Sequence, residues 1–142
     1  MHWTKKQETP YRENRGNRLN QILAIAAGGA LGAISRYGMS TGIYALLGRG
    51  FPYGTLAVNV LGSLLMGFLY VFLIERMTAS VELRAILLIG FLGSFTTFST
   101  FSLETMTLIQ QAEMFKALLN ILLSVVVCLL ATWAGFILAR LL

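Results

Sequence analysis

Four long apolar runs dominate this sequence of 142 residues and leave few folds open to it. They cover approximately residues 19–47, 53–74, 83–109 and 115–141. A helix needs about 20 predominantly apolar residues to cross the hydrocarbon core of a bilayer, and each run meets that length. Backbone polar groups within a bilayer must be satisfied internally, which helices achieve along a single segment. The runs therefore predict an all-α membrane protein with four transmembrane helices.

Short connectors and a basic N-terminal tail complete the predicted organisation. The connectors read GRGFP, ERMTASVE and QQAEM, and such short links favour antiparallel helices that are neighbours in both sequence and space. Only 12% of the residues are charged, too few to cover a soluble domain of this length. We therefore expect one four-span domain at residues 19–142. Residues 1–18 form a basic tail, which we expect to be disordered or to lie against anionic lipid headgroups.

The positive charges predict an orientation only if the tail is counted. With four spans, the tail, the second connector and the C-terminus share one side of the membrane. That side carries Lys5, Lys6, Arg12, Arg15, Arg18, Arg76, Arg84 and Arg140, and the other carries Arg49 and Lys116. Counted whole, the chain inserts with its N-terminus in the cytoplasm. Without the tail the count is three against two, which leaves both orientations open to the core.

The residue types argue against several functions. His2 is the only histidine and lies in the tail, and Cys128 is the only cysteine. A histidine-based catalytic triad or a metal site of several histidines therefore cannot form in the predicted helices, so we do not expect an enzyme. The net charge of +5 does not indicate nucleic acid, because the basic residues neither interleave with aromatic residues nor form a stripe on a folded face.

Three of the runs carry small or polar residues at every fourth position, so that each set lies along one helix face. The sets are Ala24, Gly28, Gly32, Arg36 and Ser40; Thr55, Asn59 and Ser63; and Asn120, Ser124, Cys128 and Thr132. One interpretation is structural: small residues let helices approach closely, polar ones bond helices together, and Arg36 reaches an interface. The other is a polar path. Hydrogen-bond donors prevail, Glu104 is the only acid inside a run, and such a path suits a small anion.

The third run contains the stretch GSFTTFSTFSLE, from Gly93 to Glu104. Its clustered hydroxyl residues weaken a helix, so we expect a break there, which is tolerated at membrane depth only inside protein or beside a cavity. Freed carbonyls could hold a cation, and N–H groups could face an anion. Phe98 and Phe101 share a helix face, and their positive ring edges can meet an anion, although phenylalanines in a helix more often serve packing.

Together, the stretches GGALGAISRY, GTLAVNVLGS and GSFTTFSTFSLE resemble those of the Fluc or CrcB-type fluoride channels. The likeness covers all four runs, in the family's order and with its spacing. It implies four-helix subunits with a broken third helix, packed as an antiparallel, dual-topology dimer with two fluoride pathways between the subunits. It also implies passive export of fluoride through the bacterial inner membrane, which lowers the cytoplasmic concentration.

The resemblance assigns roles to residues of the three stretches and of the fourth run. Asn59 would donate a hydrogen bond to fluoride, and the rings of Phe98 and Phe101 would meet the ion with their edges. The remaining pathway residues would be the hydroxyls of Ser99 and Thr100, Arg36 in an aqueous vestibule, Thr55 and Ser124 in the polar lining, and Glu104 near the end of the pore. A structural sodium ion between the subunits would be bound by the backbone carbonyls of Gly93 and Thr96.

Two departures from the family and two other functions stay open at this point. The basic tail favours one orientation, so the second subunit is either an antiparallel copy of this chain or an oppositely oriented paralogue. Ser94 stands where the family often has glycine. A small multidrug-type exporter has the same size, but it normally needs an acidic residue in the first helix, and residues 19–47 contain none. A scaffold without transport activity is separated from a channel by measuring fluoride efflux.

Overall fold

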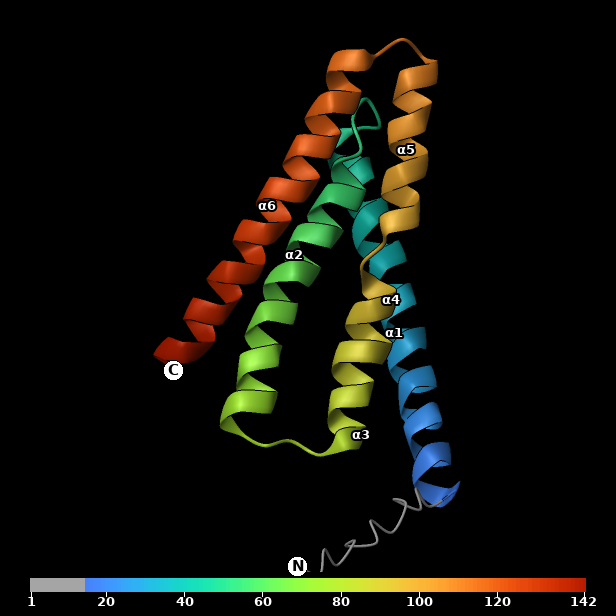
Figure 1. Cartoon of the computed structure of the whole chain (residues 1–142). Coiled ribbons are helices and arrows are strands. Elements are labelled where there is room, and N and C mark those ends of the chain that lie inside the picture. The colour runs from blue at the N-terminus through green and yellow to red at the C-terminus, as the bar shows by residue number, and fades with distance from the viewer. Residues whose placement is uncertain (1–14) are drawn as a thin grey trace, which may run out of the picture.

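The computed structural model describes residues 15–142, in which every regular element is a helix (Figure 1). Four helical segments are long and apolar enough to cross a membrane, at Arg18–Leu47, Tyr53–Arg76, Val81–Gln110 and Met114–Leu141. The prediction of four spans is therefore confirmed. The prediction of a disordered tail falls largely on residues outside the described part, and the first helix, α1, begins at Arg15 rather than at residue 19.

Two of the four spans are built from more than one helical element. The first and last spans are the continuous helices α1 (Arg15–Leu47) and α6 (Met114–Leu141). The second span consists of α2 (Tyr53–Tyr70) and the π-helical η1 (Val71–Arg76). The third consists of α3 (Val81–Arg84), the π-helical η2 (Ala85–Leu92), α4 (Gly93–Phe95) and α5 (Phe98–Gln110). The spans alternate in direction, and the connections after α1 and α5 lie at the same end of the bundle (Figure 1).

The closest packing does not follow the order of the chain. The most extensive contacts join α2 with α6 and α1 with η2, whereas the contacts between α1 and α2 are fewer (Figure 1). The expectation that sequential helices are the main neighbours is therefore wrong. Glycines explain the difference, because a Cβ at Gly28 of α1 would collide with the carbonyl oxygen of Ile86, and one at Gly135 of α6 with that of Leu64. Without those side chains the paired backbones approach closely.

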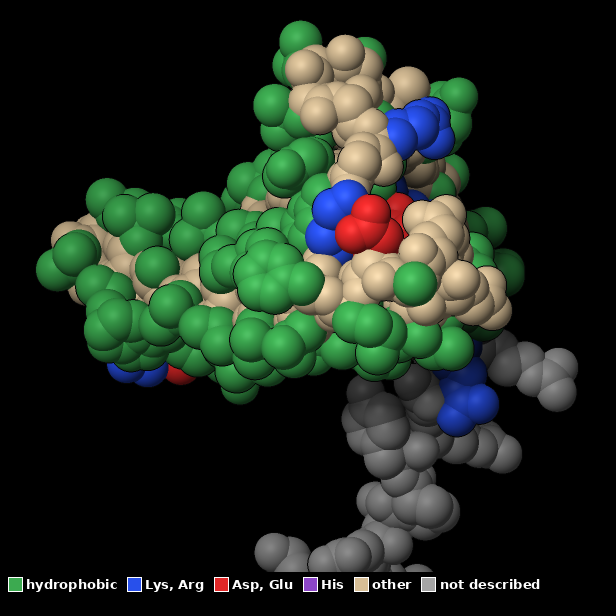
Figure 2. Space-filling model, turned by 90° about the horizontal axis from the view of Figure 1, so that it is seen from above, with side chains coloured by type: hydrophobic (Ala, Val, Ile, Leu, Met, Phe, Trp, Pro, Cys, Tyr) green, Lys and Arg blue, Asp and Glu red, His purple; other side chains and the backbone are tan. Residues whose placement is uncertain are grey.

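The two halves of the third span pack against different helices of the chain. Its first half, η2 and α4, packs on α1, whereas its second half, α5, packs mainly on α6. The interior of the bundle is small, and its largest fully buried side chains are Leu92, Val58, Val71 and Asn120. Hydrophobic side chains cover most of the outside in the view from the end that holds the α5–α6 connection, with a few charged side chains near the middle (Figure 2). Such an apolar exterior suits lipid or another protein surface.

Candidate ion pathway

The third span is interrupted at Thr96 and Thr97, between α4 and α5. Thr96 (φ −78°, ψ 158°) and Thr97 (φ −151°, ψ 116°) have extended backbones. The Thr97 hydroxyl oxygen accepts a hydrogen bond of 3.2 Å from the backbone N–H of Thr100 and so caps the start of α5. Threonine is a favoured residue at this position because its side chain satisfies an N–H that the new helix leaves free.

Asn59 of α2 binds the extended segment through both ends of its amide. Its Nδ2 donates to the carbonyl oxygen of Thr97 at 3.0 Å, and its Oδ1 accepts from the backbone N–H of Thr97 at 2.8 Å. The N–H of Thr97 thus has a partner where the helix is interrupted, and the carbonyl of Thr97 gains a side-chain donor. Because the amide nitrogen carries two N–H groups and only one is used by Thr97, the other can serve a ligand.

The same interruption leaves the carbonyl groups of residues 93–96 without their usual helical donors, among them the two predicted sodium ligands. The backbone N–H of Thr97 lies four residues after Gly93 but donates to Asn59. The backbone N–H of Thr100 lies four residues after Thr96 but donates to the Thr97 hydroxyl. The carbonyls of Gly93 and Thr96 are therefore deprived of their helical partners, and carbonyl oxygens of this kind suit a hard cation.

A pocket of about 330 Å³ lies beside Asn59 and gathers four of the predicted pathway residues. These are Asn59, Phe98, Phe101 and Ser124, and the lining also includes Ser63, Thr97, Cys128 and Thr132. The ring centroids of Phe98 and Phe101 lie 5.3 Å apart, with their planes inclined by 45°. Phe98 is 78% exposed, so within a single chain this pocket, the phenylalanine pocket, is open on one side.

A second pocket, of about 190 Å³, gathers three further predicted residues, which are Arg36, Thr55 and Thr100. Arg36 and Thr55 line it together with Thr97 and Thr100. No described residue forms an ion pair with the half-buried Arg36. Thr97 lines both pockets, so the extended segment separates a cationic compartment from the phenylalanine pocket. Ser99 lines neither pocket, and its hydroxyl lies 3.2 Å from that of Thr97.

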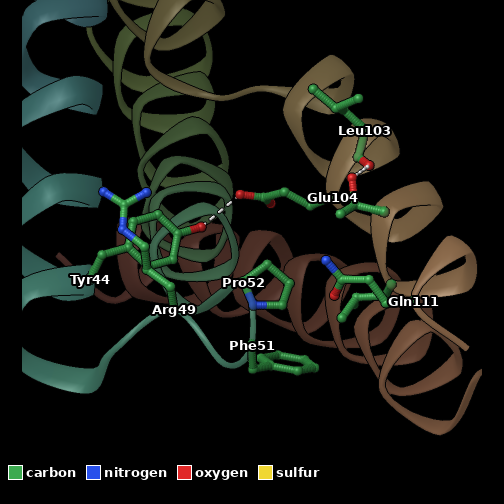
Figure 3. A pocket seen from close by; sticks show the side chains of 9 residues that line it. Tyr44, Arg49, Phe51, Pro52, Leu103, Glu104 and Gln111 are labelled. Carbon is green, nitrogen blue, oxygen red and sulfur yellow. Dashed lines mark hydrogen bonds between the residues drawn. The ribbon is translucent and has the colours of Figure 1, made fainter. Parts of the chain in front are cut away.

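Glu104 of α5 lies in a third pocket, of about 270 Å³, and is bonded to two hydroxyl groups, of which Figure 3 shows that of Tyr44. Tyr44 donates to its Oε1 at 2.7 Å and Thr55 donates to the same oxygen at 2.9 Å. Its other oxygen, Oε2, is buried and has no hydrogen-bond partner among the described residues. The only proton of the Thr55 hydroxyl is committed to Glu104, so Thr55 lines the Arg36 pocket chiefly as an acceptor.

Sequence reasoning missed Tyr44, although its position carries a signal. Tyr44 lies four residues after Ser40 and eight after Arg36, so it continues the polar face of the first span by one more turn. The Arg49 guanidinium carbon lies 5.2 Å from the centroid of the Tyr44 ring, which places a positive charge at the same end of the bundle (Figure 3).

The polar set of the fourth span divides between two environments. Ser124, Cys128 and Thr132 line the phenylalanine pocket, whereas Asn120 is 2% exposed and bonded to Thr105 of α5. Residues four apart advance by about 40° around a helix axis, so a set spanning twelve residues turns by about 120°. Neighbouring members of the set differ by only about 40°, and Asn120 lies one turn before Ser124, where it contacts Thr105 of α5 instead of lining the pocket.

Four membrane-length helices around polar pockets define a small multi-pass membrane protein. A family model described as "CrcB-like protein, Camphor Resistance (CrcB)" matches residues 23–136. The chain belongs to this family, and its recognition from the three sequence stretches is confirmed.

Curated relatives include three bacterial proteins named "Fluoride-specific ion channel FluC". The one from Methylococcus capsulatus is 57% identical over 119 residues, covering 84% of this chain and 52% of that protein. The one from Geobacter sulfurreducens is 53% identical over 122 residues, covering 86% of this chain and 98% of that protein. The one from Coxiella burnetii is 49% identical over 120 residues, covering 84% and 97% respectively. The chain thus matches about half the length of the first relative and nearly all of the other two.

Proposed function

We propose that this chain is a fluoride-selective ion channel that mediates passive export of fluoride from the bacterial cytoplasm. The observation that carries the proposal is the convergence of Asn59, Phe98, Phe101 and Ser124 on one pocket of a chain with four helices long and apolar enough to span a membrane. The names of the relatives support fluoride as the ion.

The groups around the phenylalanine pocket are suited to replace the water shell of a small anion. Ser124 offers a hydroxyl proton, Asn59 offers its remaining N–H, and aromatic rings carry positive charge at their edges. The two bonds from Asn59 to Thr97 fix the amide before an ion arrives, so little reorganisation is needed on binding. Arg36 attracts anions into the neighbouring compartment, which Thr97 separates from the rings. Thr100, which lines that compartment, and Ser99, beside Thr97, supply further hydroxyls.

A second subunit completes the pathway in this proposal. Phe98 is 78% exposed, and α6 presents many large hydrophobic side chains, among them Leu129 at 66% exposed. An open pocket beside such a surface calls for a covering protein, because an ion cannot cross beside hydrocarbon. The nearly balanced charges of the four-span core permit both orientations, which supports an antiparallel homodimer. An oppositely oriented paralogue serves equally if the basic tail fixes the topology.

The dimer would hold one structural sodium ion. The carbonyls of Gly93 and Thr96 have lost their helical donors, and oxygen ligands of this kind replace the water of a hard cation. Two subunits that cross at their third spans would supply such carbonyls from both sides. The ion would hold the interrupted spans together and would not be transported.

The test is efflux from liposomes that contain the purified chain and are loaded with potassium fluoride. With valinomycin to carry potassium, we expect rapid release measured by a fluoride electrode, and without valinomycin we expect the release to stall because fluoride carries net charge. Vesicles loaded with potassium chloride should release little. Release of chloride at a comparable rate, or no release of fluoride, would overturn the proposal.

A further inference from the structure

Asn120 is a buried polar residue of α6 that lies outside the lining of the phenylalanine pocket. Its Nδ2 donates to the hydroxyl oxygen of Thr105 at 2.9 Å. Thr105 is itself 6% exposed, and its hydroxyl donates to the backbone carbonyl oxygen of Phe101 at 2.8 Å. A chain of two hydrogen bonds therefore connects α6 to the backbone carbonyl of Phe101, a residue that lines the pocket.

The position of α5 needs such a contact because α5 does not continue the helix before it. The extended residues Thr96 and Thr97 leave its rotation undetermined by α4. Asn59 holds its beginning, and α6 supplies its most extensive packing. Apolar contacts are non-directional, whereas a hydrogen bond fixes the direction in which two groups face each other. The amide of Asn120 is thus a directional contact between α5 and α6.

We infer that Asn120 is a positioning residue for selectivity: through Thr105 it fixes the rotation of α5, and thereby the placement of the rings of Phe98 and Phe101. This inference rests on the proposed function. Thr105 follows Phe101 by four residues and therefore lies on the same face of α5. A rotation of α5 that broke the contact with Asn120 would displace both rings relative to Asn59 and Ser124, which line the same pocket.

Two substitutions of similar shape remove the contact. Asn120→Leu deletes the donor and leaves the Thr105 hydroxyl bonded to Phe101, so it leaves no hydroxyl unpaired. Thr105→Val deletes the hydroxyl and tests the same contact from the other helix. The matched control is Ser102→Ala, because the Ser102 hydroxyl also donates to a phenylalanine carbonyl, that of Phe98 at 2.9 Å, and no α6 residue is bonded to it.

The measurement is single-channel conductance in planar bilayers, with fluoride and then with chloride, because conductance per channel does not depend on how many channels fold. We expect fluoride conductance to fall about fivefold in each single variant, the ratio that one net hydrogen bond supplies. The ratio of fluoride to chloride conductance should fall with it. The double variant should match the single variants, because both act on one contact. Ser102→Ala should conduct as the wild type does.

The outcomes separate this inference from the proposed function. A wild-type chain that conducts no fluoride defeats the proposed function. A wild type that conducts, with Asn120→Leu or Thr105→Val keeping both conductance and selectivity, defeats the inference alone. Equal losses in Ser102→Ala, or additive losses in the double variant, also overturn it, because the effect would then not depend on the contact between α5 and α6.

Discussion

Replacing Asn59 by aspartate isolates the role of its amide N–H groups, because the two side chains have nearly the same shape. In the structure one amide N–H donates to the carbonyl oxygen of Thr97 at 3.0 Å, and the amide oxygen accepts from the Thr97 N–H at 2.8 Å. A carboxylate retains only the second of these bonds. Asn59→Asp therefore removes both donors and adds a negative charge to the lining of the phenylalanine pocket.

The magnitude follows from electrostatics. Two like charges about 4 Å apart repel by roughly 4 kcal/mol at an effective dielectric constant near 20. Added to the barrier for the ion, that repulsion corresponds to a reduction of roughly a thousandfold in rate. We therefore predict that Asn59→Asp lowers fluoride efflux from liposomes by about three orders of magnitude. The bond to the Thr97 N–H is retained, whereas the second carboxylate oxygen faces the Thr97 carbonyl oxygen, so assembly must be measured for the variant.

The matched control is Asn20→Asp, which makes the same change on the exposed residue Asn20 near the beginning of α1, away from the pockets. Size-exclusion chromatography confirms that each variant assembles, and a fluoride electrode measures efflux. The control should conduct as the wild type does. If correctly assembled Asn59→Asp conducts within tenfold of the control, the anion does not pass beside Asn59, and the reasoning is refuted.

Three further predictions follow from other contacts. Phe98→Ile and Phe101→Ile should each greatly reduce fluoride efflux without preventing assembly. The control Phe115→Ile changes a ring that is 77% exposed and lies outside the pocket, and it should leave efflux unchanged. Normal efflux in the first two variants would show that those rings serve only packing. A small thiol-specific reagent should block conduction by modifying Cys128, the only cysteine of the sequence. The Cys128→Ser variant should conduct and should resist the reagent. Equal block of the wild type and the variant would contradict the position of Cys128 in the pocket lining. Ala112 has φ 61° at the end of α5, so Ala112→Gly should stabilise the fold by about 1 kcal/mol and raise the melting temperature in detergent; a fall would contradict this.

The sequence predicted the spans well because length and apolar composition alone decide whether a helix can cross a bilayer. It also brought Asn59, Phe98, Phe101 and Ser124 together, since the family resemblance assigns all four to one pathway and the structure places all four on one pocket. The pairing of the spans was not predictable from connector length. Glycines on non-sequential helices determine it, and their partners are known only once the helices are placed.

The individual hydrogen bonds could not be predicted from the sequence either, because they also depend on how the helices are placed. Asn120 continues the series of Ser124 and Cys128 at fourfold spacing, yet it bonds to Thr105 of α5 instead of lining the pocket. Asn59 was expected to serve an ion, and the structure adds that it first satisfies the backbone of Thr97. Both roles depend on which groups of another helix lie opposite, which spacing within one helix does not reveal.

The most direct test of the central claim is the zero-current potential of wild-type channels in a planar bilayer with fluoride on one side and chloride on the other. For a monovalent ion, each tenfold preference displaces that potential by about 59 mV. We predict a displacement of at least about 118 mV, two such steps, in the direction of fluoride selectivity. A potential near zero would show that the phenylalanine pocket does not discriminate between the two anions and would contradict the account.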